Sequence, residues 1–548
     1  MSDLGGGSQT PAAVADKGRE RSIGLLGSAV PLPARAERAL LLLALCLALA
    51  LRMWVAWQPV PVLLERNLPD DAYYYFVLAH HAVQEGTVSL DGVNTTNGFH
   101  PLWLVLLLPV FGAADTPGDL QVHLALSLGV LLDLVCLLAL ARATSRLAGF
   151  PAPGVIAAFV YALNPMAVLQ STNGLETSLS MALLGLFLAA FVAWLSPERP
   201  GKRALLVGVL GGAAFLARSD NAFFLAVAFA MAFFHWRKDP AKRLSVFQAG
   251  AVAALVAAPW FLWSKLVVGS WIQESGMAVP IAIRYRFELA EGQGFGAAIV
   301  ESIRQMTYPN LWLRGDPTGL PLVGGGILWL WVLLRLAARW RHDQRPFEKQ
   351  IMTILLGSGA LLFFFHAGLR WYPRPWYFSP MAGAFAVAAG LALQSAGQRR
   401  TWNGLACVAI AIYFLASGAL LWRLGLYPWQ REMRLASQWI SSATPVGSSV
   451  ASFNAGIYAY YGGRQVVNLD GVVNHAAFDA VKDRALAAYI LSAGIGYLVD
   501  YDSAVHREYA PLMGNGYPEI LEPVAVLGGA LDGPLGLLRA YRIQPPDG

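Results

Sequence analysis

Long apolar runs separated by short polar gaps are the feature that most constrains how this chain can fold. Hydrophobic residues make up 56% of its 548 residues and charged residues only 14%, and the mean hydropathy is +0.49. A helix that crosses a bilayer needs about 20 apolar residues in succession, whereas a soluble globule does not. The chain is therefore predicted to be a polytopic α-helical membrane protein of about 11 transmembrane helices. The runs are 38–57, 120–141, 154–170, 175–194, 204–217, 222–234, 245–263, 320–337, 351–369, 375–393 and 402–424.

Basic residues mark alternate gaps between the runs. With the N-terminus in the cytoplasm, every inside gap holds Lys or Arg, as Arg142 and Arg146 do after the second run, and cytoplasmic loops generally carry positive charge. An odd number of spans then leaves everything after residue 424 outside. The formal net charge of +6 is spread over these gaps, so no nucleic-acid partner is expected.

Changes of composition divide the chain into three parts. Residues 1–36 are rich in Gly, Ser, Ala and charge without periodicity, which predicts a disordered cytoplasmic tail. Residues 37–425 form the transmembrane domain, with a first outer loop at 58–118 and a long outer loop at 267–319. Residues 426–548 alternate strand-like and helix-like runs, which predicts a small extracytoplasmic α/β domain. Its predicted strands are 449–453, 465–469 and 496–500, and its predicted helices are 434–441 and 476–490.

The first outer loop carries two adjacent carboxylates, Asp70 and Asp71, close to the end of the first span. Asp70 follows a proline and is predicted to cap an amphipathic interfacial helix that stops at Gly86. One interpretation is that both carboxylates only cap and charge the start of this helix. The other is that one of them is a base tuned by apolar surroundings, with Tyr73 and Tyr74 placed to hydrogen-bond a phosphate or a sugar.

Outer-face arginines are the predicted ligands for an anionic group, because a guanidinium offers paired donors to phosphate oxygens. Arg218, Arg370 and Arg374 qualify by their placement between spans. The alternative for Arg218 is a salt bridge to Asp220. For Arg370 and Arg374 the alternative is an aromatic belt at the membrane surface, where arginines extend their charge toward water.

Three more polar residues of the outer face are predicted to line a substrate. Tyr372 lies between two of these arginines, Asp220 follows Arg218, and Glu176 follows an Asn-Gly turn. Glu176 has the alternative role of charging the start of the next helix. Asp133 lies inside the second span, where an ionisable side chain is costly unless it is paired, and we expect it to pair helices.

These residues carry a resemblance to a known family. The sequence from Asp70 to Tyr74 after the first span, and Gly-Phe-His100-Pro101 later in the same loop, resemble the GT-C integral membrane glycosyltransferases. The likeness extends over roughly 39–424 and is greatest to the group of protein O-mannosyltransferases and aminoarabinose transferases.

The resemblance implies an activity in the cell envelope. Such enzymes move a sugar from a polyprenyl-phosphate donor to an acceptor on the extracytoplasmic face, here of a bacterial inner membrane. The acidic pair of the family matches Asp70 and Asp71, and the first is implied to be the catalytic base. Relatives often have Glu at the second position, so Asp71 is a departure. His100 stands where a basic residue helps to hold the donor phosphate.

The expected reaction is protein or glycan glycosylation by direct displacement at the anomeric carbon, which inverts its configuration. Its partners are the lipid donor, a glycan, lipid or protein acceptor, and the bilayer. This reaction requires no cofactor and admits a divalent metal ion without needing one.

Two other functions remain open. A pyrophosphate-donor oligosaccharyltransferase or ligase would want a metal ion, which Asp70 and Asp71 with Asp220 or Glu176 are predicted to bind. A membrane transporter would want ionisable groups spread through the midplane of the membrane, where Asp133 is the main carboxylate.

Overall fold

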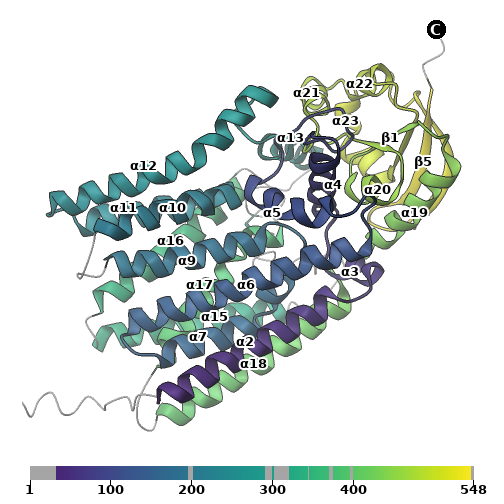
Figure 1. Ribbon diagram of the computed structural model, residues 1–548. Helices are drawn as coiled ribbons and strands as arrows, with labels where there is room; N and C mark the ends of the chain where they lie inside the picture. Colours follow the sequence, from purple (N-terminus) through teal and green to yellow (C-terminus); the bar gives the residue numbers. More distant parts are fainter. Residues whose placement is uncertain are drawn as a thin grey trace, which may run out of the picture.

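A bundle of long helices with a small α/β domain at one end makes up the protein (Figure 1). The computed structural model describes residues 33–195, 201–289, 296, 299–300, 320–342, 345–368, 374–394 and 399–544. Residues 1–32 of the predicted tail and most of the second half of the long outer loop lie outside these residues, and the last residues of the predicted tail already belong to α2. The bundle contains α2 (Ala34–Ala56), α6 (Asp119–Ala148), α7 (Ala152–Leu163), α8 (Pro165–Gln170), α9 (Thr177–Leu195), α10 (Gly201–Ala217), α11 (Ala222–His235), α12 (Pro240–Trp263), α15 (Leu320–His342), α16 (Pro346–Gly368), α17 (Pro380–Ala392) and α18 (Arg399–Leu424).

The bundle bears out the polytopic helical class. Each predicted run overlaps helix in the described part of the chain, although the run 154–170 is divided at Asn164 into α7 and α8. Six helices are long and apolar enough to cross a membrane by length and composition. The others are shorter or less apolar, so the count of eleven stays a prediction. Small residues bring neighbouring helices close together: a Cβ at Gly208 or Gly212 of α10 would lie 2.6 Å from a backbone oxygen of α12. Such close approach is typical of membrane helices.

A buried ion pair joins three helices inside the bundle. Asp133 of α6 accepts hydrogen bonds from Arg52 of α2 at 2.7 Å and from Tyr161 of α7 at 2.6 Å. Arg52 also donates to the backbone oxygen of Ala162 at 2.9 Å. The predicted helix-pairing role of Asp133 is therefore confirmed.

The first outer loop folds into three helices, α3 (Val60–Arg66), α4 (Asp70–Gln84) and α5 (Pro101–Gly112). The predicted cap at Asp70 is wrong, because Pro69 is the N-cap residue and no side chain caps the helix. Gly86 follows the helix with a φ of +70°, as a helix stop requires. Residues 72–79 are all buried, because α4 packs on both α5 and the C-terminal domain. After α12, a π-helical turn η2 (Ser264–Val268) leads into α13 (Glu274–Leu289).

The C-terminal domain is a five-stranded sheet in the order β2-β1-β3-β5-β4 with helices around it. Strands β2, β1 and β3 are parallel, and β5 is antiparallel to both of its neighbours. The three predicted strands are confirmed, and the predicted helix 476–490 is two helices, because Arg484 between them has a φ of +54°. The elements are α19 (Gln430–Ala443), β1 (Ser449–Ser452), α20 (Gly456–Tyr461), β2 (Gln465–Asn468), α21 (His475–Asp483), α22 (Leu486–Ser492), β3 (Tyr497–Tyr501), η5 (Ala504–Glu508), α23 (Ala510–Met513), β4 (Leu521–Gly529) and β5 (Leu537–Ile543).

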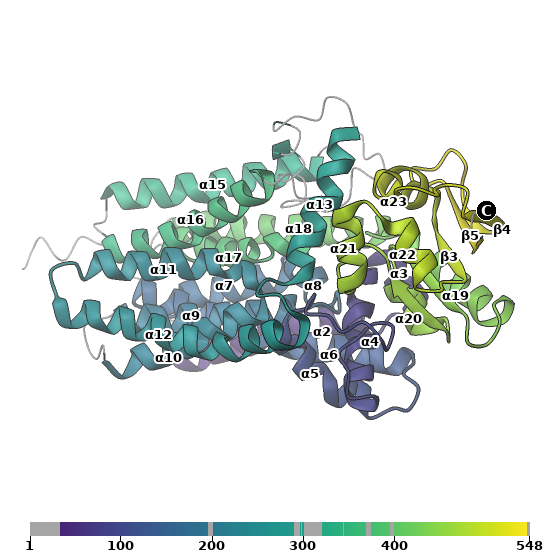
Figure 2. The ribbon, with the colours of Figure 1, turned by 90° about the horizontal axis from the view of Figure 1, so that it is seen from above.

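Seen from above, this domain lies at the end of the bundle near α3, α4 and α13 (Figure 2). Helix α20 packs on α4, α19 packs on α3, and α21 packs on α13. The first outer loop is therefore enclosed between the bundle and the domain.

Removing one member of the buried ion pair is expected to destabilise the bundle more than removing both. Asp133→Leu leaves the Arg52 guanidinium without its carboxylate partner, which should lower the free energy of unfolding by about 3–5 kcal/mol. The double variant Arg52→Met/Asp133→Leu should recover most of this loss. Thermal unfolding of both proteins in the same lipid nanodiscs checks the prediction, which fails if the double variant is the less stable.

Candidate functional site

An open cavity of about 2040 Å³ lies between the bundle and the C-terminal domain. Its walls come from α4 and the loop before α5, the starts of α9 and α11, the region around α13, the end of α16 and the C-terminal domain. It brings together seven of the predicted site residues in the described part of the chain, namely Asp71, Tyr74, His100, Glu176, Arg218, Asp220 and Arg374. Arg370 and Tyr372 lie outside the described residues.

Asp70 points away from this cavity and into the C-terminal domain. Its carboxylate accepts backbone hydrogen bonds from Ile457 at 2.7 Å and from Gly456 at 3.1 Å. Amide groups in the first turn of a helix have no partner within the helix, and a carboxylate satisfies them. Position 456 has no room for a side chain, because a Cβ there would lie 2.3 Å from the Asp70 backbone oxygen. Burial raises the pKa of Asp70 to about 7 in spite of these bonds.

Asp71, the next residue of α4, is half-buried and lines the cavity. Burial raises the pKa of its carboxyl above the usual value, the positive charge of Arg374 opposes this shift, and the negative charge of Glu176 adds to it. Of the adjacent pair, Asp71 is thus the carboxylate exposed to a bound molecule, and Asp70 joins the two domains.

Arg218 lies between two carboxylates on the bundle side of the cavity. It donates to both oxygens of Asp220, at 3.0 and 2.6 Å, and to Glu176. Burial alone would raise the pKa of Asp220, but the guanidinium outweighs it and holds that pKa below the usual value. The salt bridge that was the alternative for Arg218 is confirmed, and its charge is already balanced within the protein.

His100 completes this group of side chains. Its Nε2 lies 3.7 Å from a Glu176 oxygen, and its backbone amide donates to the Tyr75 hydroxyl at 3.1 Å. Burial lowers the pKa of His100, although Glu176 opposes the shift. The lowered pKa favours the neutral imidazole, whose ring N–H can still donate a hydrogen bond.

Arg374 enters the cavity just before the short helix η4 (Pro375–Phe378). Its guanidinium lies 5.9 Å from the centre of the Trp376 ring. Tyr377 of the same turn stacks on His366 with ring centres 4.4 Å apart, and Arg218 lies 5.4 Å from the centre of the Tyr377 ring. A cation thus stands beside aromatic rings at the mouth of the bundle.

The two tyrosines predicted to line a substrate have different surroundings. Tyr73 is fully buried and packs edge-on against Tyr460, with ring centres 5.2 Å apart. Tyr74 lines the cavity, and its hydroxyl accepts from the Ala455 amide at 3.2 Å and from Asn468 at 3.2 Å. Only Tyr74 lies where a bound molecule can reach it.

Sequence reasoning missed Asp470, a third carboxylate of the cavity. It follows β2 and accepts from the Val472 amide at 2.9 Å. Burial raises the pKa of Asp470 to about 7, and the charge of Asp71 contributes to the shift. Polar residues at the carboxyl ends of parallel strands gather at one edge of a sheet, where ligands often bind. Asn454, which follows β1, meets the cavity at the same edge.

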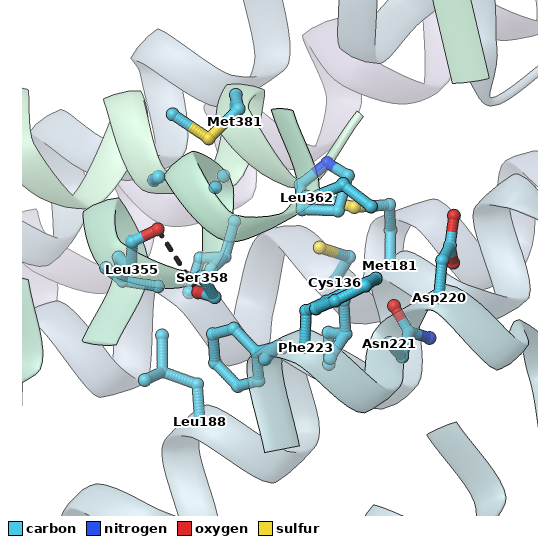
Figure 3. Close-up of a pocket in the computed structure, with 18 residues that line it drawn as sticks. Cys136, Met181, Leu188, Asp220, Asn221, Phe223, Leu355, Ser358, Leu362 and Met381 are labelled. Atoms are coloured by element: carbon cyan, nitrogen blue, oxygen red, sulfur yellow. Dashed lines mark hydrogen bonds between the residues drawn. The ribbon is translucent and has the colours of Figure 1, made fainter. Parts of the chain in front are cut away.

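An apolar crevice within the bundle adjoins the cavity. The two share Asp220 and Phe223. Figure 3 shows Asp220 and Asn221 at one side of the crevice, with Met181, Leu355 and Leu362 among the side chains that line it. The site therefore joins a polar chamber to a space suited to hydrocarbon.

These features and the bundle define a class: the chain has the fold of the GT-C integral membrane glycosyltransferases. Among solved structures, ArnT from Cupriavidus metallidurans, bound to undecaprenyl phosphate, aligns with a TM-score of 0.55 at 14% identity, over 91% of this chain and 97% of its own. The apo oligosaccharyltransferase of Archaeoglobus fulgidus aligns with a TM-score of 0.54 at 15% identity, over 92% of this chain and 76% of its own. The same organism's AglB, in complex with an inhibitory peptide and a dolichol-phosphate, gives 0.52 at 16% identity, over 87% and 70%.

Sequence comparisons add one match. A family model described as a domain of unknown function (DUF8728) matches residues 425–539, which coincide with the C-terminal domain. No curated protein sequence gives a significant match.

Asp70→Asn is expected to loosen the C-terminal domain. The amide would turn an NH2 group toward one of the two backbone N–H donors, leaving a buried donor without an acceptor and costing about 1–3 kcal/mol. Hydrogen exchange of residues 456–461 should become faster and the melting temperature should fall. Asp532→Asn, at an exposed position, is the matched control. Unchanged exchange in Asp70→Asn would contradict the assignment.

Proposed function

We propose that this protein is a membrane glycosyltransferase that moves a sugar from a polyprenyl-phosphate donor to an acceptor hydroxyl on the extracytoplasmic face of the membrane. The observation that carries the proposal is one site that combines an accessible carboxylate, Asp71, with a cation, Arg374, and an apolar crevice. A lipid phosphate needs the cation and the apolar crevice, and the transfer of its sugar needs the carboxylate. The fold and the bound undecaprenyl phosphate of ArnT support the same class of donor.

Asp71 is the proposed general base. A base must reach the acceptor hydroxyl, and Asp71 lines the cavity, whereas the Asp70 oxygens accept backbone hydrogen bonds in the domain interface. Burial raises the pKa of Asp71, and a carboxylate with a raised pKa is a better proton acceptor near neutral pH. The role of general base, expected for Asp70, is therefore assigned to Asp71 in this proposal.

Arg374 is the proposed ligand of the donor phosphate. It is the bundle-side arginine whose charge acts on Asp71, so a phosphate held by it would lie near the base. His100, whose neutral form is favoured by burial, would donate a hydrogen bond to the same group. Arg218 would orient Glu176 and Asp220, whose charges already balance its own.

The proposed reaction is a single displacement. The acceptor oxygen attacks the anomeric carbon while its proton passes to Asp71. The bond between that carbon and the phosphate oxygen breaks, and its electron pair leaves with the phosphate, whose developing charge Arg374 stabilises. Attack from the side opposite the leaving group inverts the anomeric configuration.

The oligosaccharyltransferase alternative with a pyrophosphate donor is supported less well. Its metal ion would need open carboxylate oxygens. In the described residues, Asp70 is bonded to α20, and Glu176 and Asp220 are bonded to Arg218. No group of three or more possible ligands in that part of the chain could hold a metal ion, so the donor set does not fit this mechanism.

Replacing the base should remove transfer without removing donor binding. Asp71→Asn keeps the size of the side chain but cannot accept the proton, and the rate should fall about 100- to 10,000-fold. The assay uses purified protein in lipid nanodiscs with a panel of radiolabelled polyprenyl-phosphate sugars, scoring transfer or slow hydrolysis of the donor. Lipid-phosphate binding is measured in parallel, and Asp532→Asn is the control. If Asp71→Asn keeps full activity, or if wild type binds no lipid phosphate, the proposal is wrong.

The pH profile should follow the charges around Asp71. The base works only when ionised, so kcat/KM should rise with pH through a pKa above the usual 3.8 of an aspartate. Arg374→Gln removes a charge that lowers this pKa and should move the acidic limb to higher pH. Glu176→Gln removes a charge that raises it and should move the limb to lower pH. Equal profiles for all three proteins would exclude Asp71 as the titrating group.

A further inference from the structure

The cavity is polarised between its two sides. The C-terminal domain contributes Asn454, Asp470, Val472, Val473, Glu508 and Tyr509, and none of these is Lys, Arg or His. The lining cations and histidines of the described residues, Arg218, Arg374, His100 and His366, all come from the bundle and its first outer loop. The bundle side carries both signs of charge, because Asp71, Glu176 and Asp220 also line it, whereas the wall that the domain provides has carboxylates and none of these cations. An anionic group is therefore disfavoured at the domain wall.

Asp470 and Asn454 make this wall a set of hydrogen-bond acceptors. One oxygen of Asp470 accepts from the Val472 amide at 2.9 Å, and a carboxylate has capacity for several more donors. Asn454 donates a hydrogen bond from its side-chain NH2 group to Asp500 at 3.3 Å. Its carbonyl oxygen is left to accept a hydrogen bond from a bound molecule. A bound molecule must bring several hydrogen-bond donors to match them.

Tyr509 adds an aromatic surface beside these acceptors. Its ring stacks on the buried Phe453 with centres 4.0 Å apart and an angle of 12° between the planes, so it is held in one orientation while it lines the cavity. A sugar ring has hydroxyl donors around its edge and an apolar C–H face. Acceptors next to a fixed aromatic ring are complementary to both parts.

We propose that the wall formed by Asn454, Asp470 and Tyr509 is the acceptor subsite, and that the acceptor is an uncharged, hydroxyl-rich sugar of a glycan or glycolipid. This inference rests on the glycosyltransferase function proposed above and names its acceptor class. Asp470 is a binding residue for the acceptor sugar, opposite the base Asp71.

The same wall disfavours other acceptors. A hydroxyl next to a phosphate or carboxylate group would bring negative charge against Asp470. A peptide would need donors for its backbone carbonyl groups, and neither the ionised form of Asp470 nor the carbonyl oxygen of Asn454 can donate to them. An uncharged sugar brings no negative charge to Asp470, and its hydroxyl groups can donate to the acceptors of the wall.

The test measures saccharide binding instead of turnover. Full-length protein in nanodiscs is saturated with farnesyl phosphate, which occupies the cationic side. Dissociation constants are then obtained by NMR for neutral methyl glycosides of several hexoses, for the methyl glycoside of galacturonic acid, and for short peptides that contain Ser, Thr or Asn. We expect a neutral glycoside to bind more tightly than the uronate and the peptides.

Asp470→Ala should weaken binding of the neutral glycoside about tenfold or more. It should also reduce the difference in affinity between the neutral glycoside and the uronate. Asp532→Ala should change neither value. Melting temperatures show that both variants are folded, and farnesyl phosphate should bind equally to both.

The inference is overturned if farnesyl phosphate binds but no neutral glycoside does. A folded Asp470→Ala with unchanged glycoside affinity, or peptide binding that depends on Asp470, would also overturn it. Absence of farnesyl phosphate binding would instead contradict the proposed function, so the two failures are distinguishable.

Discussion

The hydrogen bonds from the first turn of α20 to the Asp70 carboxylate hold the site together. They join the C-terminal domain to the helix that starts the first outer loop, and position 456 must be glycine for the two backbones to approach. Successive residues on a helix point about 100° apart. Fixing Asp70 in the domain interface therefore directs Asp71 elsewhere, and the cavity is where it points. One member of the acidic pair positions the other.

Burial determines which charged side chains of the site are held in internal ion pairs. Arg218 is 5% exposed, and a guanidinium so deep needs carboxylate partners, which Glu176 and Asp220 provide. Replacing such an established pair by a transient ligand would leave charges unpaired. Arg374 is only half-buried, and it acts on Asp71 from the cavity mouth. In the proposed reaction, a donor phosphate near Arg374 would therefore leave the ion pairs of Arg218 in place.

Local patterns were enough to predict the helical bundle, three strands of the C-terminal domain and the loop that carries the acidic pair. Apolar run length and strand-like alternation are properties of neighbouring residues, so they can be recognised along the sequence without knowledge of the fold. The family resemblance implied that Asp70 is the base, but local patterns could not test this ranking, because it depends on α20, which joins the site from far along the chain. Asp470 was missed for the same reason. Only the parallel pairing of β2 with β1 brings its strand end to the cavity.

The two sides of the cavity belong to different parts of the chain. The groups that suit a lipid phosphate, namely Arg374, His100 and the apolar crevice, belong to the bundle and its first loop, where the fold is that of the GT-C enzymes. The polar wall opposite belongs to the domain matched by a family of unknown function. A donor side and an acceptor side on separate domains can change independently, provided that the contact between them is kept. The bonds between Asp70 and α20 are one such contact, so the proposed acceptor wall could change without moving the proposed base or the proposed lipid site.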